Sequence, residues 1–178
     1  MKTHNLINNC HVINDFINEE ERELMLEKAE RHFRDGEYIT NPAGPQRYFT
    51  RLEFPPQLDD LVERMANRVV ETFGLQGCPQ EPVLNKLLSR IEPGGYVQSH
   101  TDQLVDLQQL AKSQGKHVQM PDNSDNFRCN IIVQMADESA YPLLDDEVVK
   151  VGECDAWGFL PSRTRHGTQL ITGGTRII

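Results

Sequence analysis

Four polar residues in the second half of the chain have the types and the spacing of a metal site beside an anchored acid. His100 and Asp102 stand two positions apart in YVQSHTDQ, and His166 and Arg176 stand ten positions apart in RHGTQLITGGTRII. Two imidazoles and one carboxylate, with coordination positions left open, suit a ferrous ion that must also bind substrate atoms and dioxygen. An arginine suits a carboxylate, because its planar guanidinium stays charged and donates two parallel hydrogen bonds.

A strand would place the first two of these residues together. Side chains alternate across a strand, so His100 and Asp102 would point to one face and Thr101 to the other. Taken singly, His166 is more often an ordinary half-buried histidine, and Arg176 is more often a surface salt-bridge donor of little energetic value. The order and the spacing of the four residues together are what favour a site.

The composition limits the functions that are open to the chain. Its 178 residues suit one domain, residues 1–178, with a core of its own. The net charge of -9 and the isoelectric point near 5.1 provide no overall basic surface for nucleic acid or for an anionic membrane. No apolar run is long enough to cross a membrane, and the N-terminal stretch lacks the apolar core of a signal peptide. We therefore expect a cytoplasmic protein.

The cysteines suggest neither a zinc site nor a redox pair. They lie far apart in the sequence and include no Cys-x-x-Cys motif. We expect all four to be buried thiols in a reducing compartment. The four are Cys10, Cys78, Cys129 and Cys154.

The first eighty residues (1–80) are interpreted as a helical layer. Asn18 stands where a helix N-cap should, and Glu21 is a capping-box partner, which predicts a helix from about Glu19 to Phe33. A second apolar stripe, from Leu58 to Phe73, follows FPP and ends at GLQGCP. We expect both helices to pack without taking part in chemistry, and the segment NPAGPQRYFTRLEF between them to lead into a short strand.

Residues 81–178 change to short runs broken by turns, which favours a barrel or a jelly roll. The runs are VLNKLLSRIE, YVQSH, FRCNIIVQM, EVVKV, AWGFL, TRHGTQLI and TRII. Alternation in the third run predicts one apolar face and a second face polar enough to line a site. The apolar face comprises Phe127, Cys129, Ile131, Val133 and Met135, and the other face comprises Arg128, Asn130, Ile132 and Gln134.

A long connection follows directly on His100 and Asp102. Residues 103–126 begin with a brief helical pattern and continue as a polar, turn-rich stretch that contains His117. Connections of that length in a compact domain are usually functional or disordered. We expect this segment to be a lid over the site.

The turn before Arg176 needs a particular length. A two-residue loop at Gly173-Gly174 would turn Arg176 away from the face of His166. A three-residue loop, Thr172 to Gly174, would instead pair Arg176 with Leu170 and keep it on that face. We therefore expect a three-residue loop or an equivalent bulge, with its last glycine at positive φ.

These motifs resemble a known family, the Fe(II)- and 2-oxoglutarate-dependent oxygenases, particularly the prolyl hydroxylase-like and aspartyl/asparaginyl hydroxylase-like branches. The signature of that family is His-x-Asp, a distal His and an Arg ten residues later. RIEPGGYVQSHTD looks like the approach to the first ligand, GECDAWGFLPSRTRHG like the approach to the second histidine, and VINDFINEEERELM like the N-terminal opening. The resemblance covers nearly the whole chain and is strongest from Leu84 to the end. It is carried by His100, Asp102, His166 and Arg176.

The resemblance implies a fold and a reaction. The fold would be mainly β with flanking helices (α+β), a double-stranded β-helix or cupin-like jelly roll with the N-terminal helices packed outside. His100, Asp102 and His166 would bind Fe(II), and Arg176 would pair with the distal carboxylate of 2-oxoglutarate. The reaction would use O2 to hydroxylate an unactivated C–H bond of a small molecule, peptide or protein, and would release succinate and CO2. Amino-acid side chains would be the leading substrate class.

Three features of the sequence bear on that resemblance. The prolyl hydroxylase-like branch often has a tyrosine two residues before Pro-Gly that contacts 2-oxoglutarate, whereas this chain has Ile91. The second co-substrate contact is therefore left open between Asn85, Arg128 and Asn130. The chain stops two residues after Arg176, where family members usually continue, so either the last strand is short or the sequence is truncated. Halogenating relatives typically replace the acid with a small residue, and its presence here favours hydroxylation.

Two other functions compete with hydroxylation. A non-catalytic metal-binding jelly roll would need the three ligands but would have no use for Arg176. A nucleic-acid demethylase of the same superfamily would place its arginines farther from the distal histidine and would usually carry a basic groove. Neither feature is seen in the sequence.

Overall fold

The computed structural model describes residues 5–7, 10–35, 39–40, 44–51, 56–79, 86–102, 112, 125–137 and 140–178. These residues are mainly β, with two helices, α1 (Glu19–Arg34) and α2 (Pro56–Phe73). Both helices agree with the two predicted from capping and apolar spacing. No helix in the described ranges is long and apolar enough to span a membrane.

Among the described residues, the strands form three four-stranded sheets in which every pairing is antiparallel. The first sheet has the order β1 (Asn5–Ile7), β2 (Cys10–Ile13), β10 (Ala156–Phe159), β7 (Arg128–Ile131). The second has the order β6 (Val97–His100), β11 (His166–Thr168), β8 (Pro142–Leu144), β9 (Glu147–Val148). The third has the order β12 (Arg176–Ile177), β5 (Leu87–Ile91), β4 (Arg47–Arg51), β3 (Ile39–Thr40).

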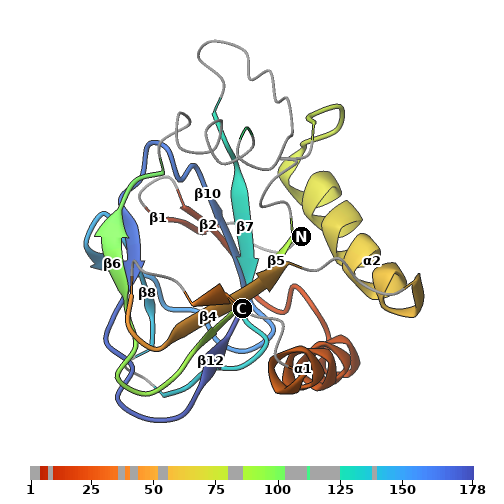
Figure 1. Cartoon of the computed structure of the whole chain (residues 1–178). Coiled ribbons are helices and arrows are strands. Elements are labelled where there is room, and N and C mark those ends of the chain that lie inside the picture. The colour runs from red at the N-terminus through yellow and green to blue at the C-terminus, as the bar shows by residue number, and fades with distance from the viewer. Residues whose placement is uncertain are drawn as a thin grey trace.

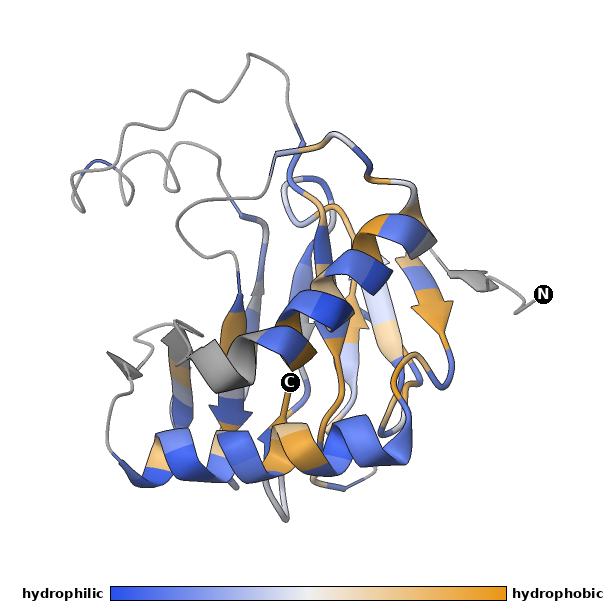
Figure 2. Ribbon diagram, turned by 90° about the vertical axis from the view of Figure 1, so that its right-hand side faces the viewer, coloured by the Kyte–Doolittle hydropathy of each residue, from blue (hydrophilic) through white to orange (hydrophobic). Residues whose placement is uncertain are grey.

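Both helices lie on the same side of the strands (Figures 1 and 2). Their apolar faces supply one core cluster, in which Met25 and Ala29 of α1 and Leu61 and Met65 of α2 are 5% exposed or less. Burial of these side chains is what holds the helices against the sheets. A separate cluster lies between strands and includes Ile132, Leu144, Trp157 and Phe159.

The first turn of α1 is fixed by the predicted capping box. The Asn18 side chain accepts a hydrogen bond from the Glu21 backbone N–H at 2.8 Å, and the Glu21 carboxylate accepts one from the Asn18 N–H at 3.1 Å. Arg68 of α2 donates two further hydrogen bonds to the same carboxylate, at 2.7 and 2.9 Å. The hydrogen bonds from Arg68 lower the pKa of Glu21 despite its burial. Glu21 therefore caps one helix and joins it to the other.

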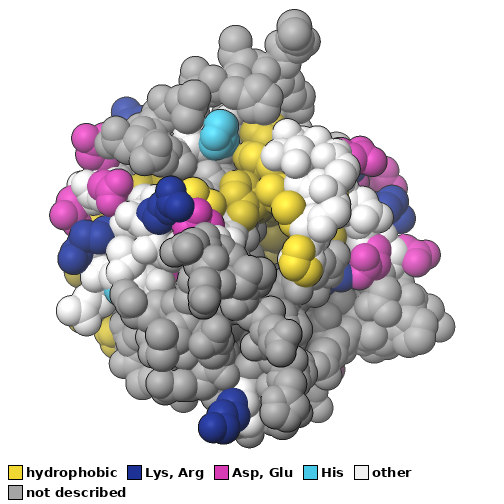
Figure 3. Space-filling model, turned by 90° about the horizontal axis from the view of Figure 1, so that it is seen from above, with side chains coloured by type: hydrophobic (Ala, Val, Ile, Leu, Met, Phe, Trp, Pro, Cys, Tyr) yellow, Lys and Arg dark blue, Asp and Glu magenta, His cyan; other side chains and the backbone are white. Residues whose placement is uncertain are grey.

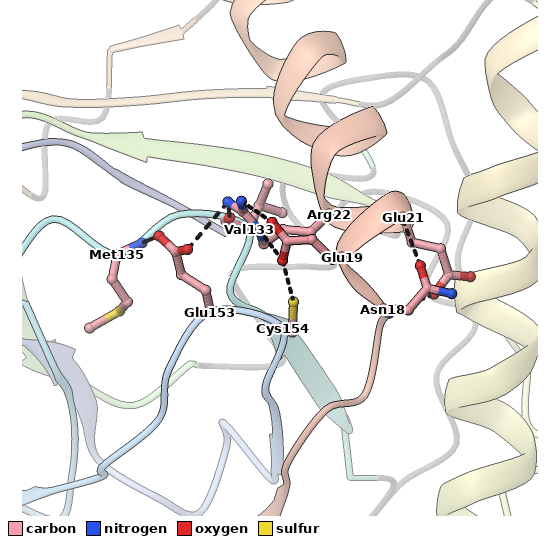
Figure 4. A network of polar contacts seen from close by, with 8 residues as sticks. All are labelled: Asn18, Glu19, Glu21, Arg22, Val133, Met135, Glu153 and Cys154. Carbon is pink, nitrogen blue, oxygen red and sulfur yellow. Dashed lines mark hydrogen bonds and ion pairs between the residues drawn. The ribbon is translucent and has the colours of Figure 1, made fainter.

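A second network ties the same turn to the sheets (Figure 4). Arg22 pairs with Glu19 on its own helix and with Glu153, 3.3 Å away, in the segment before β10. Arg22 also donates to the Val133 carbonyl at 3.3 Å, and Glu153 accepts from the Met135 backbone N–H at 3.1 Å. The N-terminus of α1 is thus anchored to two segments more than a hundred residues away in sequence.

Two expectations about the N-terminal region and the cysteines were wrong. Residues 1–80 include strands β1, β2 and β3, which sequence reasoning missed, because β2 gains its long-range partner only from β10. Cys78 is exposed, whereas Cys10 is buried and Cys129 and Cys154 are partly buried. All four are free thiols, as predicted.

The predicted hairpin between His166 and Arg176 was also wrong, although its glycine geometry was right. Gly174 has φ +71°, but Arg176 pairs with Ile91 of β5 rather than with Leu170. The reason is that the chain leaves β11 and crosses to another sheet.

We predict that Asn18→Ala lowers the free energy of unfolding by about 1 kcal/mol, because it removes the acceptor of one otherwise unpaired helix N–H. Asn18→Asp, which keeps the acceptor, should be nearly neutral. Urea denaturation of the three proteins measures the difference. Equal stability of the Ala variant and the wild type would contradict the importance of this cap.

We predict that Gly174→Ala destabilises the fold more than Gly94→Ala does. Both glycines have positive φ, +71° and +84°, so both substitutions carry backbone strain of about 1–2 kcal/mol. A Cβ at Gly174 would also lie 2.6 Å from the Ala136 carbonyl oxygen, whereas a Cβ at Gly94 meets nothing within 4 Å. Thermal unfolding of the two variants measures how much stability each substitution removes, and the difference between them is the contribution of the steric clash. Equal destabilisation by the two substitutions would rule out that contribution.

Candidate metal and acid-binding site

The two histidines are placed by one strand pairing. His100 ends β6 and His166 begins β11, and the two residues are register partners in the antiparallel ladder. Their ring centroids lie 4.4 Å apart. The His166 side chain is buried against Phe159, whereas that of His100 is 41% exposed, so the pair reaches from the interior of the protein to its surface.

Asp102 joins the histidines from just beyond the end of β6. The expectation that strand alternation positions it was wrong, since β6 stops at His100 and the Asp102 N–H bonds instead to the Pro161 carbonyl at 2.9 Å. Its Oδ1 nevertheless lies 3.4 Å from Nε2 of His100 and 3.4 Å from Nε2 of His166. One donor atom from each residue lies within 4.8 Å of the other two. A single metal ion can therefore be held by these three groups.

Backbone carbonyls select the tautomer of both imidazoles. Nδ1 of His100 lies 2.7 Å from the Gln98 carbonyl oxygen, and Nδ1 of His166 lies 3.1 Å from the Thr164 carbonyl oxygen. A carbonyl only accepts, so each Nδ1 must carry the proton, and each Nε2, which lies toward Asp102, is the nitrogen left to bind a metal ion when it carries no proton. Fixing the remote nitrogen in this way orients a metal-binding histidine and makes it a better ligand.

The carboxylate of Asp102 is held in its charged form. Burial opposes ionisation, but hydrogen bonds with His100 and His166 and the charge of Arg128 outweigh it and depress the pKa of Asp102. The Arg128 guanidinium forms an ion pair with Asp102 and lies 3.2 Å from Nε2 of His166. The pKa of His100 is raised, chiefly by its hydrogen bond with Asp102. Asp102 is therefore in the ionised form that binding a cation requires.

A pocket next to these three residues is lined by residues of all three sheets. It contains about 490 Å³ of empty space, part of which is open to solvent. Its wall includes apolar side chains, three arginines and the two histidines. The arginines are Arg47 of β4, Arg128 of β7 and Arg176 of β12.

Arg176 lines the same pocket but is almost inaccessible to solvent. It is 1% exposed, and its guanidinium lies 5.7 Å from the centroid of the Trp157 ring. Nη1 donates to the Ala140 carbonyl at 3.1 Å, while Nε has no partner among the described residues. Burial lowers the pKa of Arg176 to about 9, and the nearby Arg47 contributes to that shift, so the group is still charged at neutral pH. A buried guanidinium whose donors are not all paired is stabilised when an anion binds to it.

The remaining predicted contacts have different outcomes. Arg128 and Asn130 line the pocket, from the face of FRCNIIVQM that alternation assigned to a site. Asn85 lies outside the described residues, and so does the proposed lid, residues 103–126, apart from Lys112, Asp125 and Asn126. Sequence reasoning missed Arg47, because only the pairing of β4 with β5 brings it to the pocket.

Comparisons with known proteins identify the fold. No protein-family model and no curated protein sequence matches this chain. Among solved structures, a prolyl-4-hydroxylase from Pseudomonas putida is 12% identical, with 98% of this chain and 89% of that chain covered and a TM-score of 0.60. A Trichoplax adhaerens prolyl hydroxylase, in complex with a hypoxia inducible factor peptide fragment, is 10% identical, with 96% and 80% covered and a TM-score of 0.67. HygX from Streptomyces hygroscopicus, with nickel, 2-oxoglutarate and hygromycin B bound, is 14% identical, with 95% and 80% covered and a TM-score of 0.65.

The chain therefore has the fold of these oxygenases, prolyl hydroxylases among them. The resemblance first noted in the sequence motifs is confirmed at the level of the fold. Similarity at 10–14% identity is a statement about architecture. Function must be argued from the site itself.

We predict that Ni(II), a redox-stable probe, binds to the wild-type protein with one ion per chain, and that His166→Ala weakens this binding by more than about 100-fold. Loss of an outer-shell partner alone costs 10–100-fold in metal affinity, and loss of a ligand should cost more. His32→Ala, on α1, is the matched control and should bind like the wild type. Calorimetric titration measures all three, and unchanged affinity of His166→Ala would remove His166 from the site.

Proposed function

We propose that this chain is an Fe(II)- and 2-oxoglutarate-dependent dioxygenase that hydroxylates an unactivated C–H bond. We further propose that its three sheets are a double-stranded β-helix, or jelly roll, as the oxygenase neighbours support. The observation that carries the proposal is that two different sites meet at one pocket. The two histidines of the metal-binding triad line the pocket from strands of one sheet, and the buried Arg176 lines it from a strand of another.

The donor set fits iron. Neutral imidazole nitrogen and carboxylate oxygen are ligands that Fe(II) accepts, and two histidines with one carboxylate leave positions open for other ligands. In the proposed enzyme His100, Asp102 and His166 hold the ion, with both Nδ1–H groups kept on backbone carbonyls. The chemistry that bound iron supplies is oxidation of a C–H bond by O2, coupled to conversion of 2-oxoglutarate to succinate and CO2.

The role of Arg176 is to hold the distal carboxylate of 2-oxoglutarate. Its rigid position over Trp157 and against the Ala140 carbonyl leaves the guanidinium little freedom, so an acid meets a preformed partner. Apolar neighbours such as Ile91, Leu144 and Phe159 exclude water from the pocket wall and strengthen that ion pair. A dicarboxylate anchored at one end presents its other end to the metal.

The substrate that we propose is an amino-acid side chain, free or within a protein. The neighbouring structures include complexes with a hypoxia inducible factor peptide fragment and with hygromycin B, so this fold admits both peptides and small molecules. Asp102 favours hydroxylation over halogenation, because it fills a coordination position that a halide would need.

Two alternative functions are less well supported. A plain metal-binding protein would gain nothing from burying an arginine beside the metal site, which costs free energy of desolvation. A nucleic-acid demethylase would require a basic groove. On the face in Figure 3, described acidic and basic side chains are interspersed, and the chain carries a net charge of -9.

We predict that Arg176→Gln weakens binding of 2-oxoglutarate to the Ni(II)-loaded protein by about 10- to 100-fold. A hydrogen bond to a charged group contributes about 1.5–3 kcal/mol, and this substitution removes the charge while keeping a polar side chain. Ni(II) affinity itself should change less than about threefold, since Arg176 is no metal ligand. Unchanged 2-oxoglutarate affinity would contradict the assigned role.

We predict that the Fe(II)-loaded protein converts 2-oxoglutarate to succinate in the presence of O2, slowly without substrate and faster with it. Candidate amino acids and peptides can be screened by succinate formation above that background. His166→Ala should form no succinate above the level of free Fe(II). A protein that binds iron and 2-oxoglutarate but produces no succinate with any candidate would favour the binding-only alternative.

A further inference from the structure

The three arginines of the pocket exceed what the proposed co-substrate requires. In the proposed enzyme the two charges of a divalent metal ion balance the two carboxylates of 2-oxoglutarate, and Asp102 offsets one guanidinium. Two positive charges remain within the pocket of a chain whose net charge is -9. None of the described side chains that line the pocket is a carboxylate. Arg176 is buried, and Arg47 and Arg128 are partly buried. Removing charge from water without a counter-charge is costly, so the surplus points to a further anion.

Arg47 contributes much of this excess positive charge. The strand register places Arg47 and Arg176 on either side of Ile91, as partners of the same residue on β4 and β12. Residues in one register row point to the same face of a sheet, and two strand spacings put the two arginine backbones about 10 Å apart. Among described residues the hydrogen-bond partner of Arg47 is the Ser89 hydroxyl, 3.4 Å from Nε, which leaves its terminal nitrogens available.

The surroundings of Arg47 place it toward the metal ligands as well as toward Arg176. Burial lowers the pKa of Arg47 to about 10, with the positive charge of Arg128 adding to the shift and Asp102 opposing it. Arg47 is thus close enough to Arg128 and Asp102 to sense both charges. Arg47 and Arg128 line the same pocket as the two histidines of the triad.

One end of Arg128 becomes available when His166 binds a metal ion. In the structure Nη2 of Arg128 pairs with Oδ2 of Asp102, and Nη1 lies 3.2 Å from Nε2 of His166. A metal ion takes the lone pair of Nε2, whereas Oδ2 of Asp102 keeps lone pairs for its ion pair with Nη2. Nη1 of Arg128 then needs another acceptor, and the position of Arg128 at the start of β7 keeps it within the pocket.

We propose that Arg47 and Arg128 form an anion subsite for the substrate, distinct from the Arg176 site, and that the substrate carries a carboxylate close to the carbon that reacts. This inference rests on the proposed function and narrows its substrate class to acidic amino acids, free or as residues of a peptide. The guanidinium of Arg47 and Nη1 of Arg128 would hold the carboxylate and fix the orientation of the neighbouring C–H bond.

The test uses the full chain loaded with Ni(II) and saturated with 2-oxoglutarate, so that the Arg176 site is already filled. The calorimetric probes are l-glutamate and l-aspartate, for a free substrate, and their N-acetyl amides, for a peptide residue. Each probe is paired with its side-chain amide, glutamine or asparagine in the same form. We expect at least one acidic probe to bind about tenfold or more tightly than its amide partner, because the amide cannot replace a charge-assisted pair.

Substitutions then assign the binding to the two arginines. Arg47→Gln and Arg128→Gln should each remove the preference for the acid, whereas Arg47→Lys should keep part of it. Arg31→Gln, an exposed arginine on α1 that pairs with Glu27, is the matched control and should behave like the wild type. Circular dichroism and thermal unfolding verify that each variant is folded.

Three results would overturn the proposal. One is the absence of any preference for an acidic probe in the wild type, and another is a preference that survives in either Gln variant. The third is an Arg47→Gln variant that loses 2-oxoglutarate affinity but keeps the acid preference, which would make Arg47 a co-substrate anchor. Failure of the proposed function is distinguishable, because it would appear earlier, as a wild-type protein that does not bind 2-oxoglutarate together with the metal.

Discussion

The antiparallel pairing of β6 with β11 is the constraint on which the site depends. It makes His100 and His166 register partners, and a slip by one residue would turn one imidazole to the opposite face of the sheet. Gly167 allows the close approach, since a Cβ there would lie 2.6 Å from the Val97 carbonyl oxygen. The pairing is also pinned by the Val97 N–H, which donates to the Thr168 hydroxyl at 2.8 Å. The rigid strands, and not the loops, therefore set the distance between the two imidazoles.

The site has two parts that favour ligands of opposite charge. The triad, with an ionised Asp102, can bind a cation, whereas the arginines on β4, β7 and β12 favour anions. Described side chains do not pair all the donors of these arginines, as the unpaired Nε of Arg176 illustrates. Binding of a metal ion and of acids would neutralise these charges. It would therefore stabilise the folded chain as well as enable its chemistry.

Patterns among neighbouring residues in the sequence were sufficient to predict part of this structure. The capping box at Asn18 and Glu21 and the apolar stripe of α2 predicted both helices, because helix ends and helix faces are encoded within a few residues. The triad was recognised from spacing and family resemblance. Long-range pairing was not accessible: β2 was missed, Arg176 was assigned to a hairpin with β11 although it pairs with β5, and Arg47 was overlooked. Each of these depends on which distant strand is the neighbour, and a single sequence does not contain that information in local form.

The central claim is that the triad and Arg176 act on one molecule of 2-oxoglutarate. The most direct test is the affinity of the wild-type protein for 2-oxoglutarate with and without Ni(II), measured by calorimetry at one pH and one ionic strength. If one end of the acid binds the metal while the other meets Arg176, the affinity with metal should be at least about tenfold higher, because the two contacts reinforce each other. Equal affinities in the two states would contradict the account and would leave the metal site and the buried arginine as unrelated features.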